Sequence, residues 1–327
     1  NEPLKPKQMN VLADDGISPS GKTKLEAAGF KVITDTVDQD KLVDYINSND
    51  VKALLVRSAT TVRKDIIDGC AGLKFIGRGG VGMDNIDVAY AREKGKTVSN
   101  TPASSSQSVA ELVMGQLFSL ARSTYDANRE MPRHGATEFK TLKKKYAKGF
   151  ELRGKTLGIV GFGRIGKSLA SYALGAGMKV ICTYVFDVDT KVHVHIEGHG
   201  DVEVNVEKVD METLLRSSQA ISLHVPKQAD GSAVFGHKEL SMISRGAVLV
   251  NAARGGVIDE DALLKALESG HIAGAALDVF ENEPTPREDL MKADKIALTP
   301  HIGAATAEAQ DRIGEELADL IIADFSR

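Results

Sequence analysis

The sequence predicts an α/β protein of two domains, each built around a parallel sheet. Three observations lead to this fold class. Short apolar or β-branched segments alternate with segments of helical spacing along the chain. A glycine-rich turn, Gly161, Gly163 and Gly166, separates one such strand from the helix after it. The length of 327 residues is also sufficient for two domains of ordinary size.

The segment 156–166 (Thr-Leu-Gly-Ile-Val-Gly-Phe-Gly-Arg-Ile-Gly) organises the second domain. An apolar strand leads into G-x-G-x-x-G, and a helical segment, 167–174, follows it. The glycines permit a tight turn, close approach of the backbone to a pyrophosphate, and close packing of the helix. The helix N-terminus supplies unpaired amides for the phosphates. With a further strand at 178–182, this pattern predicts a Rossmann-type dinucleotide-binding domain.

The first hundred residues predict a separate, flavodoxin-like α/β domain. Its expected strands are 10–13, 31–34, 53–56, 73–77 and 97–100, and its expected helices are 21–28, 38–47 and 88–94. An amphipathic helix at 304–326 is expected to return to this domain and make it discontinuous. We therefore expect a substrate-binding domain of residues 1–100 and 300–327, and a dinucleotide-binding domain of residues 101–299.

In the second domain, Ser108 and Glu111 have the spacing of a capping box at the start of a long helix. The basic stretch 129–154 is expected to be irregular, either as a solvated loop or as an anion site or subunit contact. The other expected strands are 220–225, 247–251, 274–279 and 296–299, and the other expected helices are 211–216, 237–242, 260–268 and 286–291.

Residues 191–209 alternate between apolar and polar side chains around Gly198 and Gly200, which predicts a β-hairpin. His193, His195 and His199 lie in this segment, but no cysteine or nearby carboxylate pair completes a set of ligands. We interpret them as part of a solvated face and expect no metal site.

Composition excludes several classes of partner. The net charge of −4 and pI near 6.1 give no general attraction to nucleic acid or anionic membranes, and no apolar run is long enough to span a bilayer. Cys70 and Cys182 are the only cysteines. We therefore expect a reduced, cytoplasmic protein.

Three loops that follow apolar strands carry the candidate chemistry: Arg254 after the strand at 247–251, Glu283 after the next strand, and His301 after the last. The carboxyl ends of parallel strands form the usual ligand site. Oxidation of an alcohol needs a base for the hydroxyl proton, a hydride acceptor and a cation for the substrate carboxylate. His301, a nicotinamide cofactor and Arg254 fit these roles, and Glu283 fits as the carboxylate that orients the imidazole.

These motifs resemble the D-isomer-specific 2-hydroxyacid dehydrogenase family over nearly the whole chain. The matching segments are G-x-G-x-x-G, then Asn-Ala-Ala-Arg-Gly at 251–255, Asp-Val-Phe-Glu-Asn-Glu-Pro at 278–284, and Pro-His-Ile-Gly at 300–303. The resemblance implies that the arginine binds substrate, the histidine is the acid/base and the glutamate orients it. It also implies that NAD is bound by Val81, Gly161, Gly163, Arg164, Ile165, Gly166, Tyr184, Asp187, His224, Val225, Pro226, Ala252, Ala253, Arg254, Asp278, His301 and Gly303.

Within the family, the segments 56–60, 77–87 and 100–102 most resemble members that oxidise 3-phospho-D-glycerate to 3-phosphohydroxypyruvate, the first step of the phosphorylated route to L-serine. The resemblance implies that Arg57, Arg78, Gly80, Val81, Arg254 and His301 bind this substrate. Guanidinium groups suit a substrate with both phosphate and carboxylate. The lysines at 143–145 are a candidate addition, from a neighbouring subunit of the homodimer that the family leads us to expect.

Two departures from the family pattern stand out. Tyr184 replaces the acid that usually binds the adenosine ribose, with Asp187 three residues later, so the preference between NAD and NADP stays open; we expect NAD because no arginine is nearby. Many relatives also carry a C-terminal regulatory domain that senses serine, and we expect this chain to lack it. The alternatives are a glyoxylate/hydroxypyruvate reductase and a non-enzymatic NAD-sensing protein like the corepressors built on this fold.

Overall fold

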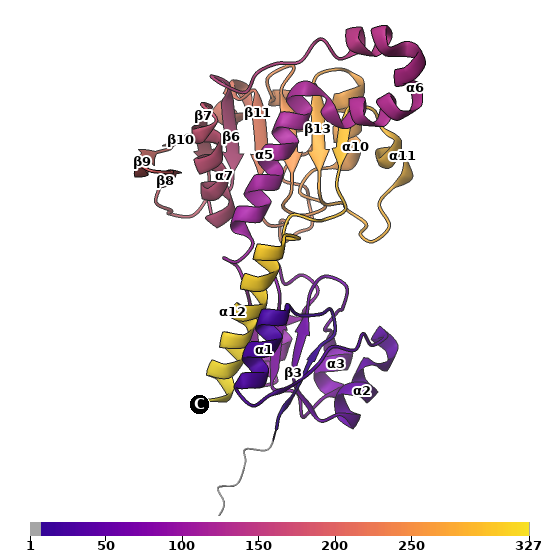
Figure 1. The fold of residues 1–327 in the computed structure, drawn as a ribbon, viewed down its shortest axis with the longest axis vertical. Coiled ribbons are helices and arrows are strands. Elements are labelled where there is room, and N and C mark those ends of the chain that lie inside the picture. The colour runs from indigo at the N-terminus through magenta and orange to yellow at the C-terminus, as the bar shows by residue number, and fades with distance from the viewer. Residues whose placement is uncertain (1–7, 327) are drawn as a thin grey trace, which may run out of the picture. The chain divides into compact units, whose positions relative to one another are not determined.

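The chain forms two α/β units, and the structure, a computed structural model, describes residues 8–326 (Figure 1). Unit 1 comprises residues up to Ser106 together with Ala304 onward, and unit 2 comprises Gln107–Gly303. The fold class predicted from the sequence is confirmed: a Rossmann-type unit and a discontinuous, flavodoxin-like α/β unit. No helix among residues 8–326 combines the length and the apolarity needed to cross a membrane.

Unit 1 is built on a five-stranded sheet in the order β2-β1-β3-β4-β5, in which every pairing is parallel. This is the flavodoxin-like order. The strands are β1 (Asn10–Ala13), β2 (Lys31–Ile33), β3 (Val51–Val56), β4 (Phe75–Arg78) and β5 (Thr97–Asn100). The expected strands of this unit lie at these positions, with ends that differ by up to two residues.

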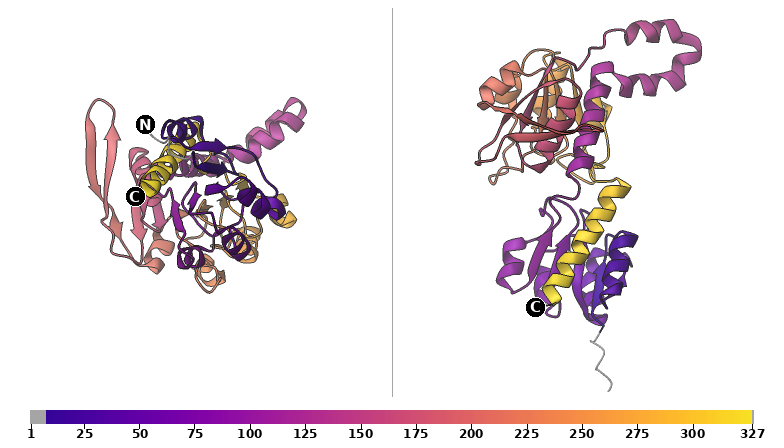
Figure 2. Two further views of the ribbon diagram at one scale, coloured as in Figure 1. Left: turned by 90° about the horizontal axis from the view of Figure 1, so that it is seen from below. Right: turned by 60° about the vertical axis from the view of Figure 1, so that its left-hand side comes forward.

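Helices cover both faces of this sheet. They are α1 (Pro19–Ala27), the 3₁₀ turn η1 (Gln39–Lys41), α2 (Leu42–Ser48), α3 (Lys64–Gly69), α4 (Val88–Glu93) and α12 (Ala307–Phe325). The predicted return helix is α12, which lies along α1 (Figure 2). The two approach closely because both have glycine at the crossing: a β-carbon on Gly21 would lie 2.5 Å from the backbone of Gly314.

Unit 2 is built on a seven-stranded parallel sheet in the order β10-β7-β6-β11-β12-β13-β14. Its strands are β6 (Thr156–Val160), β7 (Lys179–Thr183), β10 (Glu207–Lys208), β11 (Ala220–Leu223), β12 (Val248–Asn251), β13 (Gly274–Leu277) and β14 (Ile296–Leu298). Its helices are α5 (Ser106–Arg122), α6 (Thr124–Lys145), α7 (Arg164–Gly175), α8 (Met211–Ser217), α9 (His237–Met242), α10 (Glu260–Glu268) and α11 (Glu288–Lys292). The strand order reverses at β6, and so places the glycine-rich turn at the switch point of the sheet.

The predicted hairpin is present as β8 (Lys191–Ile196) and β9 (Gly200–Asn205), a separate two-stranded sheet beside α7. Its polar face carries ion pairs, Lys191 with Glu203 at 2.9 Å and His195 with Asp201 at 2.8 Å. The expectation that the hairpin extends to residue 209 is wrong. Residues 207–208 form β10, which pairs with β7 and joins the main sheet.

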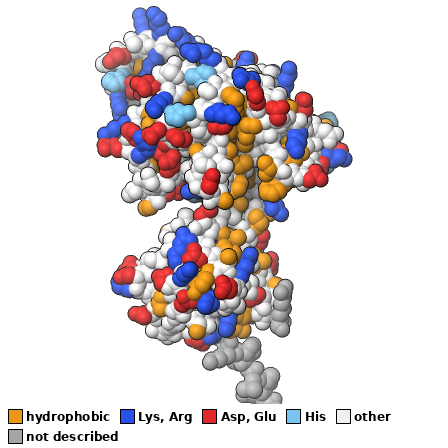
Figure 3. Space-filling model, turned by 180° about the vertical axis from the view of Figure 1, so that it is seen from behind, with side chains coloured by type: hydrophobic (Ala, Val, Ile, Leu, Met, Phe, Trp, Pro, Cys, Tyr) orange, Lys and Arg blue, Asp and Glu red, His pale blue; other side chains and the backbone are white. Residues whose placement is uncertain are grey.

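Two other expectations need correction. Residues 129–145 are helical, because they belong to α6, which consists of two helical stretches joined by a kink at Glu138 (φ −121°, ψ 24°). Pro132 and Gly135 inside α6 conceal its periodicity. Residues 146–154 are irregular, as expected. Ser108 is not a helix cap, because α5 begins two residues earlier, and Glu111 instead accepts a hydrogen bond from Tyr172 on α7. On the face drawn in Figure 3, acidic and basic side chains are interspersed over much of the surface.

Candidate active site

The glycine-rich turn between β6 and α7 has the geometry of a dinucleotide cradle. Gly161 has φ of +92°, and a β-carbon there would lie 2.3 Å from the His224 carbonyl oxygen. A β-carbon on Gly166 would lie 2.4 Å from the Gly161 carbonyl oxygen, so this glycine lets α7 pack against the turn. Above Gly163 nothing lies within 4 Å, and no side chain caps the first amides of α7. The turn therefore leaves open space and unpaired donors of the kind that a pyrophosphate requires.

The other candidate cofactor residues of unit 2 lie at the carboxyl ends of neighbouring strands. Tyr184 and Asp187 follow β7, His224, Val225 and Pro226 follow β11, Ala252, Ala253 and Arg254 follow β12, Asp278 follows β13, and His301 and Gly303 follow β14. β7 and β11 flank β6, and β11, β12, β13 and β14 are consecutive in the same parallel sheet, so the structure brings the residues to one edge. Val81, by contrast, belongs to unit 1.

His224 has an unusual environment. Its Nε2 lies 2.8 Å from the hydroxyl of Ser222, and its Nδ1 is buried without a hydrogen-bond partner among the described residues. Burial lowers the pKa of His224 to about 4, so the imidazole is neutral near pH 7. It therefore adds no positive charge to the strand edge that carries the candidate cofactor residues.

His301 and Glu283 form a hydrogen-bonded pair, with Nδ1 of the imidazole 2.7 Å from Oε2 of the carboxylate. The other oxygen, Oε1, accepts the amide of Phe280 at 3.0 Å. Burial would raise the pKa of Glu283, but the hydrogen bonds from His301 and the Phe280 amide, with the charges of His301 and Arg254, lower it overall. An ionised carboxylate only accepts, so Nδ1 carries the proton and Nε2 is left to exchange one.

The buried carboxylate of Asp278 holds the loop that carries His301. It accepts the Thr299 hydroxyl at 2.6 Å and the amides of Ile302 and Gly303 at 2.9 Å each. His301 itself has φ of +52°, in the left-handed region, and the Asp278 carboxylate holds the Thr299 side chain before it and two backbone amides after it. The sequence assigned Asp278 to the cofactor; the structure adds this positioning contact, which no motif indicates.

The arginine loop follows β12. The side chain of Asn251 bridges it, because Nδ2 donates to the Arg254 carbonyl at 3.0 Å and Oδ1 accepts the Ala253 amide at 3.0 Å. The guanidinium of Arg254 donates from Nη1 to the Ala253 carbonyl at 2.6 Å. Its charge also contributes to the lowered pKa of Glu283, so the arginine lies within electrostatic range of the His301–Glu283 pair.

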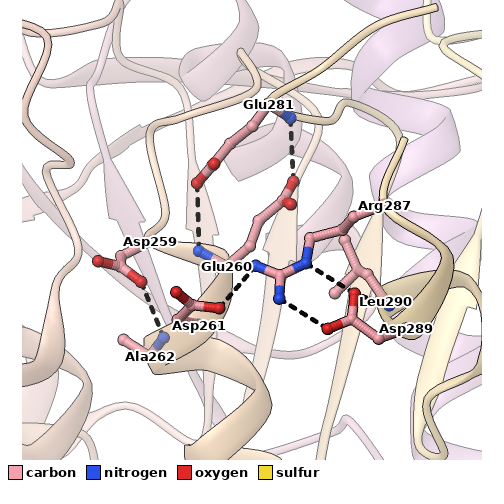
Figure 4. A network of polar contacts seen from close by, with 8 residues as sticks. All are labelled: Asp259, Glu260, Asp261, Ala262, Glu281, Arg287, Asp289 and Leu290. Carbon is pink, nitrogen blue, oxygen red and sulfur yellow. Dashed lines mark hydrogen bonds and ion pairs between the residues drawn. The ribbon is translucent and has the colours of Figure 1, made fainter. Parts of the chain in front are cut away.

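A polar network ties the loop of Glu283 to the start of α10 (Figure 4). The Glu281 amide donates to the Glu260 carboxylate at 2.9 Å, and the Glu260 amide donates to the Glu281 carboxylate at 3.3 Å. Burial raises the pKa of the Glu260 carboxyl. Arg287 joins Asp261, at 2.7 Å, to Asp289, at 2.6 Å. These contacts surround the loop on which Glu283 lies, and sequence patterns gave no sign of them.

In unit 1, Arg57 lies on a loop after β3 that is held by carboxylates. Asp15 accepts the amides of Arg57 at 2.6 Å and Thr60 at 3.1 Å, and Asn85 donates to the carbonyls of both at 2.6 Å. The Arg57 side chain is half-buried, and burial lowers the pKa of its guanidinium, against the influence of Asp15. No residue of the described chain accepts a hydrogen bond from this guanidinium or forms an ion pair with it.

The glycine pair after β4 is shaped by Arg78. Gly80 has φ of +137°, and a β-carbon there would lie 1.6 Å from Nη1 of Arg78, which donates to the Gly79 carbonyl at 2.7 Å. The Gly80 amide was expected to hold substrate, but it donates to the Thr101 hydroxyl at 2.8 Å. The carbonyl of Val81 accepts from Asn100 at 2.6 Å. The backbone here is therefore ordered by contacts within unit 1.

One cation near the cofactor edge was not found from the sequence. Lys208 of β10 places its ammonium 4.0 Å from the centre of the Tyr184 ring. Sequence proximity pointed only to Lys191. The signal for Lys208 is the pairing of β10 with β7, and a two-residue strand is too short to be predicted from periodicity.

Comparison with known proteins agrees with this geometry. Residues 114–303 match the family model described as "D-isomer specific 2-hydroxyacid dehydrogenase, NAD binding domain". The chain is 42% identical over 299 residues to a hydroxypyruvate reductase of Thermotoga maritima, covering 90% of this chain and 91% of that protein. It is 38% identical over 313 residues to a D-3-phosphoglycerate dehydrogenase of Methanocaldococcus jannaschii, covering 96% of this chain but only 57% of that longer protein.

Among solved structures, the TT0316 protein of Thermus thermophilus superposes with a TM-score of 0.82 at 28% identity, over 97% of each chain. The fold, the NAD-binding cradle and the match to the family model agree. The chain belongs to the D-isomer-specific 2-hydroxyacid dehydrogenase family and is an NAD-dependent oxidoreductase of that family.

Proposed function

We propose that this chain oxidises 3-phospho-D-glycerate to 3-phosphohydroxypyruvate with NAD⁺, the first step of the phosphorylated route to L-serine. The observation that carries the proposal is the 2.7 Å bond between His301 and an ionised Glu283, at the strand edge where the cofactor binds. That pair provides the base that oxidation of a secondary alcohol requires.

His301, Glu283 and Arg254 have separate proposed roles in this reaction. His301, with Nδ1 bonded to Glu283, takes the substrate hydroxyl proton on Nε2. As this proton leaves the hydroxyl oxygen, the hydrogen on the carbon that bears this oxygen leaves as a hydride, and the carbonyl forms. A bound nicotinamide would supply the acceptor for that hydride. Arg254 binds the substrate carboxylate and stabilises the oxygen that becomes the carbonyl. In the reverse direction the imidazolium returns the proton.

The phosphate preference in this proposal depends on unit 1. Arg57 is half-buried, and its guanidinium has no carboxylate partner within residues 8–326. A buried cation without a partner is costly, and an anionic ligand removes that cost. Arg57 is therefore proposed as a substrate ligand for phosphate or carboxylate, since a guanidinium suits either group in bidentate geometry. Arg78, which donates to the Gly79 carbonyl, is proposed beside it on the family resemblance.

The second candidate is reduction of hydroxypyruvate or glyoxylate. It is favoured by the Thermotoga maritima hydroxypyruvate reductase, which is 42% identical and matches over 91% of its length. The same His301, Glu283 and Arg254 would serve either reaction. The two proposals differ only in whether turnover depends on the substrate phosphate.

One assay separates them. NADH oxidation is followed with phosphohydroxypyruvate, hydroxypyruvate and glyoxylate side by side, and kcat/KM is compared. We expect phosphohydroxypyruvate to be preferred by at least about 100-fold, as expected for loss of a charge-assisted contact of about 3 kcal/mol. Arg57→Ala should raise KM for the phosphorylated substrate and leave NADH affinity little changed. Equal kcat/KM for hydroxypyruvate would refute the phosphoglycerate proposal and support the reductase.

We further propose a homodimer. Helix α6 spans 22 residues with a kink at Glu138, and Leu142 is its one buried side chain among the described residues. Met131 and Phe139 are 43% and 58% exposed. A helix gains most of its stability from packing, so α6 requires a partner surface. Sedimentation equilibrium should give twice the mass of the chain, and Phe139→Asp should shift the species toward monomer; a wild-type monomer at micromolar concentration would refute the dimer.

A further inference from the structure

The end of β7 differs from that of a usual NAD-binding domain in what it offers the adenosine ribose. An acid at this position normally accepts the two ribose hydroxyls. Here the position is occupied by Tyr184, whose hydroxyl donates to the Val188 carbonyl at 3.0 Å, within its own loop. Its ring stacks on Phe162 of the glycine-rich turn, with centroids 6.4 Å apart and planes at 22°. The Tyr184 side chain is therefore held against the cradle and provides no carboxylate.

Lys208 supplies a positive charge at this place. It lies on β10 opposite Cys182 in the parallel pairing with β7, so its side chain projects from the same face as Cys182 and Tyr184. Its ammonium lies 4.0 Å from the Tyr184 ring centre, which is a cation–π contact. Lys208 is exposed and forms no ion pair with a carboxylate of the described chain. The aromatic ring fixes the ammonium in place without neutralising it.

The acids around this ammonium are few. The loop 184–190 contains Asp187 and Asp189. Asp189 is engaged on the α7 side, where it accepts the Lys191 amide at 3.0 Å and lies 3.9 Å from Nζ of Lys167. Burial and, after it, the charges of Cys182, Asp187 and Asp189 raise the pKa of the Tyr184 hydroxyl, so both loop aspartates act at this end of β7. Asp187 is exposed and, among the described residues, has no cation partner, whereas Asp189 is paired with Lys167.

We propose that Lys208, held by Tyr184, binds the 2′-phosphate of the adenosine ribose, so that the dinucleotide site accepts NADP(H) as well as NAD(H). A 2′-phosphate is usually bound by a cation near the end of this strand, and no acid at residue 184 repels it. The proposal depends on the dinucleotide cradle alone and is independent of the substrate proposed above.

The test uses nucleotide fragments, so it needs no turnover. Isothermal titration compares adenosine 2′,5′-bisphosphate with 5′-AMP on the wild-type protein and on Lys208→Ala. We expect the bisphosphate to bind the wild type about tenfold more tightly than 5′-AMP, an advantage of about 1.4 kcal/mol. Lys208→Ala should abolish the advantage, Lys208→Arg should keep it, and Lys238→Ala, an exposed lysine on α9, should leave it unchanged.

A second measurement compares NADPH with NADH by the fluorescence of the bound reduced nicotinamide. The two dissociation constants should lie within about tenfold for the wild type, and Asp187→Asn should favour NADPH by several-fold. Circular dichroism confirms that each variant is folded. The proposal is overturned if the bisphosphate and 5′-AMP bind the wild type equally, or if Lys208→Ala retains the full preference. A substrate assay that refutes the phosphoglycerate proposal would not change the outcome of these nucleotide-binding measurements.

Discussion

Gly255 and Phe280 approach so closely that a β-carbon on Gly255 would lie 1.7 Å from the Phe280 carbonyl oxygen. The loop that carries Arg254 is thus packed, backbone against backbone, on the loop that carries Glu283. Any side chain at residue 255 must push these two loops apart, and with them two of the three candidate catalytic residues.

Gly255→Ala should therefore lower both stability and turnover. Overpacking of this kind costs about 1–3 kcal/mol, and displacement of Glu283 should reduce kcat more than KM. Urea denaturation and steady-state kinetics measure the two effects. The matched control is Gly175→Ala at the end of α7, where nothing lies within 4 Å and the change should be neutral or slightly stabilising. Equal behaviour of the two variants would contradict the close packing of the loops.

Asp278→Asn should loosen the histidine loop. The carboxylate accepts two backbone amides and one hydroxyl, and an asparagine NH₂ cannot accept from an amide. We expect a loss of about 1–3 kcal/mol in unfolding free energy and a lower kcat. Because Asp278 positions His301 in this account, kcat should fall more than substrate KM rises. A variant with reduced nucleotide affinity and normal kcat would assign Asp278 to cofactor binding alone.

His301→Ala should reduce kcat by at least about 100-fold, the usual contribution of a general base. NADH should still bind, because the glycine cradle and α7 are intact, and fluorescence titration measures this. His237→Ala, an exposed histidine at the start of α9, is the control and should keep full activity. Turnover of His301→Ala near the wild-type rate would rule out the acid/base role.

His224 should make stability depend on pH. Its pKa is lowered to about 4 in the folded protein from 6.5, so between these values the unfolded chain binds a proton that the folded protein does not. Stability then falls as pH decreases from 6.5 to about 4, by up to about 3 kcal/mol. His224→Gln, which keeps a polar group for Ser222, should show a flatter profile in this window. Parallel wild-type and variant profiles in urea denaturation would show that His224 does not titrate on unfolding.

The sequence predicted most of the sheet strands because buried parallel strands are continuous apolar runs, as at residues 248–250. Prediction from the sequence failed for segments in which the periodicity of apolar residues is short or interrupted. Residues 129–145 carry Pro132 and Gly135 and are kinked at Glu138, so the sequence shows no uninterrupted helical period there. The short helix α3 and the two-residue strand β10 are too brief for periodicity to be detected.

In the candidate site, too, some residues could be proposed from the sequence, whereas some contacts are visible only in the structure. Arg254, Glu283 and His301 could be proposed as candidates from the sequence because each follows an apolar strand, and parallel strands end at one edge. The contacts of Asp278 with two amides depend on the path of the loop, and the contact of Lys208 with Tyr184 depends on strand register. Neither path nor register is encoded in spacing along the chain.

Helix α12 has a consequence for synthesis of the chain. Its residues, 307–325, leave the ribosome after all of unit 2, yet α1 near the N-terminus packs against it. Domains fold as units while the chain is being made. Unit 2 is contiguous and can close first, while α1 and the strands beside it wait, with their apolar surface uncovered, until α12 emerges. A chain truncated after residue 306 and released from the ribosome should therefore display a protease-resistant unit 2 and a protease-sensitive N-terminal segment.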